Sequence, residues 1–224
     1  ALPISIAEGA LLGAYTFNHY RSASNSPARQ SVKSIAVVCA EAKNAVVKSA
    51  VKRAVTVANA TNASRDLTNT SPLDLPPAKM AEAAAAIAEE HGLAIEVLDE
   101  KAMAKFGMGG ILGVGQGSSR GPRLIRLAYR PAGAVGHLAI VGKGITFDTG
   151  GISLKPPANM HEMKGDMSGA AAVLNTIGAI AALKLNINVT AYAACAENMP
   201  GGKAQRPGDV VTAYGGRTVE VLNT

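Results

Sequence analysis

The chain has 224 residues, of which 48% are hydrophobic, so it can bury the core of one domain or of one and a half. Its formal net charge is +6, but the charges are dispersed and no basic patch is interleaved with aromatic residues, which argues against a nucleic-acid-binding module. No apolar run is as long as a membrane span and no signal peptide is visible, so we expect no membrane partner.

The first third of the chain predicts one loop, one strand and one long helix. Residues 21–29 are rich in Ser, Asn and Pro and predict a loop, and the apolar run at 32–40 predicts a strand. From residue 41 to about 66, small apolar residues recur at the spacing of a helix face. The densest basic cluster on this helix predicts a solvated face, and salt-dependent DNA binding is the alternative. The cluster consists of Lys43, Lys48, Lys52 and Arg53.

The remaining two thirds alternate predicted helices with predicted strands, an order typical of an α/β sandwich. The predicted helices cover residues 78–91, 99–106 and 168–183, and the predicted strands cover residues 93–98, 123–129, 137–141, 189–194 and 219–222. Pro76 and Pro77 suit a helix entry, and Gly92 suits a helix C-terminus. The strands at 123–129 and 137–141 are expected to be neighbours in the sheet.

Two smaller features have plain structural interpretations. Residues 107–117 contain six glycines but lack the Lys and Ser/Thr of a phosphate-binding loop, so we interpret them as a tight loop where backbones approach closely. Cys39 and Cys195 both lie in apolar, strand-like runs. This placement predicts buried free thiols in a protein of the reducing cytoplasm.

The stretch from Val141 to Asn175 carries the chemistry. It begins with the end of an apolar strand and ends with the start of an apolar helix. The charged residues between these include Lys143, Asp148, Lys155 and Asp166. Their charges are costly to bury unless something offsets them, and functional sites of α/β folds lie in such loops beyond the strand ends.

The two aspartates are candidate metal ligands, because carboxylates are hard oxygen ligands for divalent cations. Asp166 precedes a predicted helix whose dipole favours an anion, and a plain N-cap is the alternative there. Lys143 can bind a metal only when it is neutral. In a fully extended strand Lys143 and Asp148 would lie roughly 16 Å apart, so we expect the chain to bend at Gly144 and to turn away at residues 150–151.

The residues that carry a family resemblance begin with VGKGITFDTGGISLKP at 141–156 and MKGDMSGAAAV at 163–173. The likeness extends to ENMP at 197–200, RPGD at 206–209 and VLNT at 221–224, and back to GGILGVGQGS at 109–118 and RDLTN at 65–69. With these motifs the chain resembles the leucyl aminopeptidase family, the two-metal cytosolic aminopeptidases. The resemblance is dense over the last two thirds of the chain.

This resemblance implies a role for each matching residue. Lys143 and Asp166 would bind one metal and Asp148 would bridge both, while Lys155 would stabilise the oxyanion of the tetrahedral intermediate as the catalytic cation. The resemblance places two further residues at the substrate, Met163 in the pocket for its first side chain and Asn223 in a contact that holds it. His161 lies beside the motif, but the family uses no histidine there, so we interpret it as a loop histidine.

The resemblance also implies the setting of the site. It implies an α/β fold with a mixed sheet flanked by helices, in which residues 1–40 are the tail of an N-terminal domain, 41–70 a linker helix and 71–224 the first half of the catalytic domain. The implied cofactors are two divalent zinc or manganese ions, with bicarbonate in the complete enzyme. The implied protein is a cytoplasmic homo-hexamer that acts on peptides with a free N-terminus.

The family motif continues after Asn223 and Thr224 as D-A-E-G-R, whose aspartate and glutamate are metal ligands and whose arginine holds the bicarbonate. We therefore expect this chain to be a fragment that stops just before the motif. We also expect these 224 residues to be inactive by themselves. A non-catalytic fragment or relative that acts in assembly or binding is the alternative.

Overall fold

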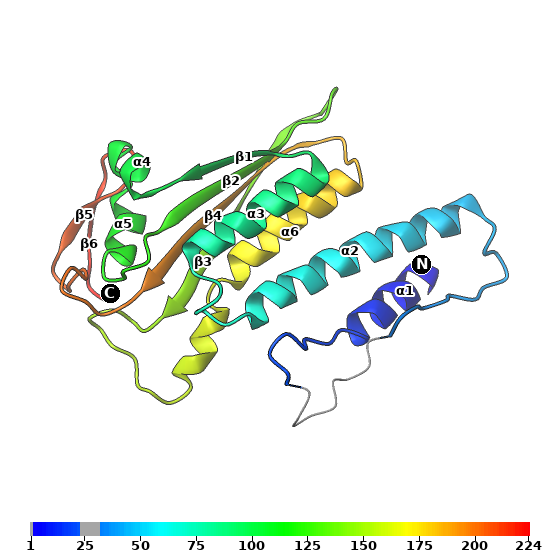
Figure 1. Ribbon diagram of the computed structural model, residues 1–224. Coiled ribbons are helices and arrows are strands. Elements are labelled where there is room, and N and C mark those ends of the chain that lie inside the picture. The colour runs from blue at the N-terminus through cyan, green and yellow to red at the C-terminus, as the bar shows by residue number, and fades with distance from the viewer. Residues whose placement is uncertain (1, 23–31) are drawn as a thin grey trace.

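A computed structural model describes residues 2–22 and 32–224 of the chain (Figure 1). Its helices are α1 (Leu2–Gly13), α2 (Ala45–Asn69), α3 (Pro77–His91), α4 (Glu100–Lys105), α5 (Gly109–Gly115), the 3-10 helix η1 (Met160–Gly165) and α6 (Ser168–Ala182). Its strands are β1 (Ala94–Leu98), β2 (Arg123–Tyr129), β3 (His137–Asp148), β4 (Asn188–Asn198), β5 (Val210–Thr212) and β6 (Thr218–Glu220). The predicted α/β fold with a mixed sheet flanked by helices is confirmed.

Four strands form the main sheet in the order β1-β2-β4-β3, and β5 and β6 form a separate hairpin. Strand β2 is antiparallel to both of its neighbours, β1 and β4, whereas β3 runs parallel to β4. The expectation that β2 and β3 are neighbours is wrong, because β4 lies between them. Helix α6 connects β3 to β4 as a crossover and so sets β4 parallel to β3. Strand β4 is buried along nearly its whole length, as suits a strand with a neighbour on each side.

Helices α3 and α6 cover one face of the sheet, α2 lies outside α6, and α1 packs on α2 (Figure 1). The core between the sheet and these helices is built mainly from alanines and aliphatic residues, which include Met80, Ala84, Ile125, Leu127, Leu174, Ile177, Val189 and Ala191. The prediction that the helix at 168–183 is buried is therefore confirmed. Small residues let α6 approach β3 closely. A Cβ added to Gly142 would lie 2.3 Å from the carbonyl oxygen of Gly169.

The predicted helix boundaries agree with the structure to within a few residues. The side chain of Asn44 accepts a hydrogen bond from the amide of Val46 and caps the start of α2. Pro77 begins α3, and Gly92 ends it with a φ of 64°. The basic residues of the predicted solvated face are exposed. Within residues 2–22 and 32–224, no helix is both long enough and apolar enough to cross a membrane.

Two predictions for irregular regions are wrong. Residues 32–39 have no regular structure, and no strand among the described residues pairs with them, so the strand predicted at 32–40 is not formed. The predicted loop at 107–117 contains the helix α5 instead. The close backbone approach expected there is present. A Cβ on Gly109 would lie 2.2 Å from the oxygen of Thr212, and one on Gly117 would lie 2.1 Å from that of Met199. The predicted loop at 21–29 lies outside the described residues from residue 23 onward.

The two cysteines differ in burial, contrary to the expectation that both are buried. Cys195 is buried beneath α6, and burial raises the pKa of its thiol to about 12, whereas Cys39 is partly exposed. A thiol with that pKa is only about one part in ten thousand thiolate at pH 8, and the thiolate is the reactive form.

We therefore expect Ellman's reagent to modify the thiol of Cys39 rapidly in the native chain and that of Cys195 only in denaturant. Cys39→Ser should remove the rapid phase, and rapid modification of both thiols would contradict the packing of β4 against α6.

Candidate metal centre

The candidate site lies where β3 and β4 end side by side. Asp148 and Asn198, the last residues of these strands, are partners in the parallel register. Gly150 and Gly151, with φ of 89° and 65°, turn the chain away from the strand as expected. The expectation of a bend at Gly144 is wrong. Strand β3 runs through this position and is interrupted only by an irregularity between Ile145 and Phe147.

Gly144 has a different role from the one expected. A Cβ at this position would lie 2.7 Å from the sulfur of Cys195 and 3.1 Å from the Cβ of Ala170. Together with Gly142 it lets the first turn of α6 lie against β3. This close approach brings Asp166, two residues before α6, to the side chain of Lys143.

The four charged residues that the sequence singles out form two lysine–aspartate pairs. The ammonium of Lys143 lies 2.8 Å from Oδ2 of Asp166, and that of Lys155 lies 2.5 Å from Oδ2 of Asp148. The aspartates are the more buried partners, with side chains 21% and 15% exposed. Each lysine therefore offsets the charge of a carboxylate that the fold partly removes from water.

Asp148 has hydrogen-bond donors on both carboxylate oxygens. Oδ1 accepts from the backbone amide of Gly150 and from Nδ2 of Asn198, and Oδ2 accepts from Lys155. Burial raises the pKa of the Asp148 carboxyl, but the hydrogen bonds from Lys155, Gly150 and Asn198 together lower it by more, so the net pKa lies below its ordinary value. The carboxylate is thus held in its anionic form, which is the form that binds a cation.

Asp166 has a buried oxygen whose partner is the exposed side chain of Lys143. Its Oδ2 is buried and lies 2.8 Å from the ammonium of Lys143, in an ion pair without hydrogen-bond geometry. The side chain of Lys143 is flexible and 59% exposed, so another cation can take its place at this oxygen. A divalent cation is a suitable partner, since carboxylate oxygens are ligands for zinc, manganese and magnesium alike.

The carboxylate oxygens at this site are therefore suitable ligands for a divalent cation, but the site offers few of them. The described part of the chain contains no group of three or more His, Cys, Asp and Glu residues that could hold a metal ion. Two carboxylates and the amine of Lys143 are the candidate ligands here. A structural zinc alone takes four ligands, so further donors must complete the coordination.

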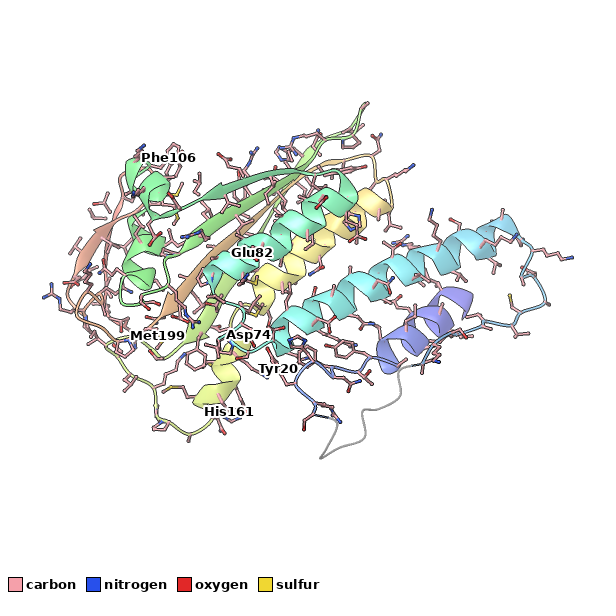
Figure 2. All side chains as sticks on the ribbon, in the orientation of Figure 1. Tyr20, Asp74, Glu82, Phe106, His161 and Met199 are labelled. Atoms are coloured by element: carbon pink, nitrogen blue, oxygen red, sulfur yellow. The ribbon has the colours of Figure 1, made fainter. Side chains whose placement is uncertain are left out.

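Three further residues singled out from the sequence are Met163, Asn223 and His161. Met163 is brought to it, with Sδ lying 3.3 Å from the ammonium of Lys155. Asn223 is exposed. His161 is exposed on the outer side of η1, away from the sheet (Figure 2). It therefore lies on a 3-10 helix rather than in a loop.

Two residues beside the centre were not predicted. Asn198 contacts Asp148, as described above. Thr224 joins the loop that carries Lys155, because its hydroxyl donates to the oxygen of Gly150 and accepts from the amide of Ser153. Asn198 belongs to the motif ENMP and Thr224 to the motif VLNT. Each follows a predicted strand, and this position could have marked both as candidate site residues.

A cleft of about 510 Å³ opens beside the centre. Lys143, Asp148 and Asn198 belong to its polar lining, and Ile111, Val114, Val141 and Ile145 are among its apolar lining. Val141 is 73% exposed, because it lies on the face of β3 opposite Gly142 and Gly144, which meet α6.

Residues 62–224 match the sequence model of the cytosol aminopeptidase family, catalytic domain. The chain belongs to the cytosol aminopeptidase family. Among the relatives of this family, a probable cytosol aminopeptidase of Streptomyces avermitilis is 52% identical over 100% of the chain and 45% of the relative. One of Mycobacterium leprae is 52% identical over 98% of the chain and 43% of the relative. The chain thus spans slightly less than half the length of these relatives.

Solved structures agree with this membership of the cytosol aminopeptidase family. The bottromycin maturation enzyme BotP in complex with Mn superposes with a TM-score of 0.87 at 37% identity, over 99% of the chain and 45% of that structure. The cytosol aminopeptidase from Coxiella burnetii superposes with a TM-score of 0.83 at 30% identity, over 98% of the chain and 45% of that structure. The fold and the family expected from the central motifs are therefore confirmed.

Proposed function

We propose that this chain carries part of the active site of a metal-dependent aminopeptidase, which removes N-terminal residues from peptides. The observation that carries the proposal is the ion pair of the partly buried Asp166 with Lys143, a residue that lines the same cleft as Asp148, in a member of the cytosol aminopeptidase family. The manganese bound in the related BotP structure supports the choice of cation. Two divalent ions, manganese or zinc, are proposed for the complete site.

Each charged residue has a proposed role. Asp148, Asp166 and Lys143 would hold the metal ions, which when bound supply a Lewis acid for the scissile carbonyl and an anchor for the free α-amino group. Lys155 would place its ammonium beside the developing oxyanion, where a fixed cation in a partly desolvated site stabilises negative charge. To do so its ammonium must leave Oδ2 of Asp148, its present partner. Met163 and Asn223 would contact the substrate.

The proposal is tested by hydrolysis of leucine-p-nitroanilide by the full-length gene product, with its intact mass measured on the same sample. We expect p-nitroaniline release that EDTA abolishes and added Mn²⁺ restores. Residues 1–224 alone, assayed in parallel, should release little, because two carboxylates and one lysine leave the proposed two-metal site incomplete. Lack of hydrolysis by the full-length product with any divalent metal would favour a role in assembly or binding instead.

A further inference from the structure

Asn198 is the only side-chain amide that contacts a predicted metal ligand among the interactions described above. Its Nδ2 lies 2.8 Å from Oδ1 of Asp148, and the residue is 8% exposed. A carboxylate oxygen only accepts hydrogen bonds, so the amide group that faces it must be the NH₂ of Asn198. The contact joins two strands across 50 residues of sequence, at the last pair of the parallel β3–β4 register.

The position of Asn198 is itself fixed by its surroundings. Its backbone oxygen accepts hydrogen bonds from the amide of Thr149, at 3.0 Å, and from the Thr149 hydroxyl, at 2.8 Å. On its other side Gly151 approaches so closely that a Cβ there would lie 2.8 Å from Oδ1 of Asn198. The side chain therefore has little freedom to rotate away from Asp148.

The neighbouring Glu197 holds the same end of β4 in place through its side-chain contacts. Its carboxylate is buried and accepts a hydrogen bond from the hydroxyl of Ser118. Arg120 lies 3.6 Å from the same carboxylate and donates to the oxygen of Pro72. The end of β4 is thus tied to the segments before β2 and α3, and Asn198 is presented from a rigid base.

We propose that Asn198 is a positioning residue, which fixes the rotation of the Asp148 carboxylate and so prepares Asp148 to bind a metal ion. Oδ1 is held by two donors with little freedom, Asn198 and the Gly150 amide, whereas the partner of Oδ2 is the long side chain of Lys155. A cation can replace a flexible lysine at Oδ2 without disturbing the two fixed hydrogen bonds. Asn198 acts only through Asp148, and the inference rests on the proposed metal-dependent function.

The test compares Asn198→Leu with the matched variant Asn175→Leu in the full-length chain. Both asparagines are 8% exposed, leucine has the same number and branching of side-chain heavy atoms, and the amide of Asn175 donates to the oxygen of Ala171 within α6, away from the metal centre. Isothermal titration with Mn²⁺ should show about 10- to 100-fold weaker binding for Asn198→Leu, the range for residues that orient metal ligands, and unchanged binding for Asn175→Leu. At saturating Mn²⁺, kcat should fall while KM stays within about twofold, because the proposed role of Asn198 is exerted on Asp148 and not on the substrate.

The outcomes separate this inference from the proposed function. Wild-type chain that binds Mn²⁺ and hydrolyses the substrate, with equal Mn²⁺ affinity in Asn198→Leu, would overturn the inference alone. Wild-type chain that neither binds nor hydrolyses would overturn both. If Asn198→Leu fails to fold, as judged by circular dichroism, Asn198→Ala removes the same amide without adding apolar bulk and gives the same comparison.

Discussion

Replacing Asp166 by asparagine is expected to reduce metal-dependent hydrolysis of leucine-p-nitroanilide by at least about 100-fold, because loss of a direct ligand should cost no less than loss of an outer partner. The change preserves the size of the side chain but removes the negative charge from the buried oxygen that pairs with Lys143. It also leaves Lys143 without its ionic partner. Mn²⁺ affinity, measured by isothermal titration of the full-length chain, should fall together with kcat/KM.

Asp74→Asn is the control for this change. Asp74 is exposed and accepts a hydrogen bond from the hydroxyl of Tyr20, so the same chemical change is made outside the candidate centre (Figure 2). We expect hydrolysis and Mn²⁺ affinity close to those of the wild type. The plain N-cap that the sequence left as an alternative is wrong, because Met167 is the N-cap of α6 and no side chain caps this helix. Equal Mn²⁺ affinity in Asp166→Asn and wild type would restrict Asp166 to its ion pair with Lys143.

Replacing Lys155 by methionine should lower kcat by about 100- to 1000-fold, the cost of removing one oxyanion-stabilising group. Mn²⁺ affinity should be retained or improved, because the change removes the ammonium that lies 2.5 Å from Oδ2 of Asp148. This combination distinguishes a catalytic cation from a metal ligand, whose loss would weaken both quantities. The measurements are steady-state kinetics at saturating Mn²⁺ and isothermal titration.

Lys203→Met provides the matched control, since Lys203 is exposed in the loop after β4 and the same charge is removed there. Its kinetics should match those of the wild type. An unchanged kcat in Lys155→Met would restrict Lys155 to pairing with Asp148. A loss of Mn²⁺ binding would instead assign it to the structure of the metal centre.

The residues of the candidate centre could be named from the sequence, but their partners could not. Lys143, Asp148, Lys155 and Asp166 stood out because charged residues lay between an apolar strand and an apolar helix. The ion pairs Lys143–Asp166 and Lys155–Asp148 depend on how closely α6 approaches β3 and on the turn after Asp148. The contact of Asn198 with Asp148 likewise depends on strand pairing.

Local patterns by themselves determined most helices and strands of this protein, including α2, α3, α6, β1 and β4, because the periodicity of apolar residues and the capping residues act within one segment. They did not determine which segments become neighbours. The order β1-β2-β4-β3, the missing strand at 32–40 and the position of Asn198 were decided by contacts between distant parts of the chain. A strand needs a partner for its backbone hydrogen bonds, and only the tertiary structure determines which partner is present.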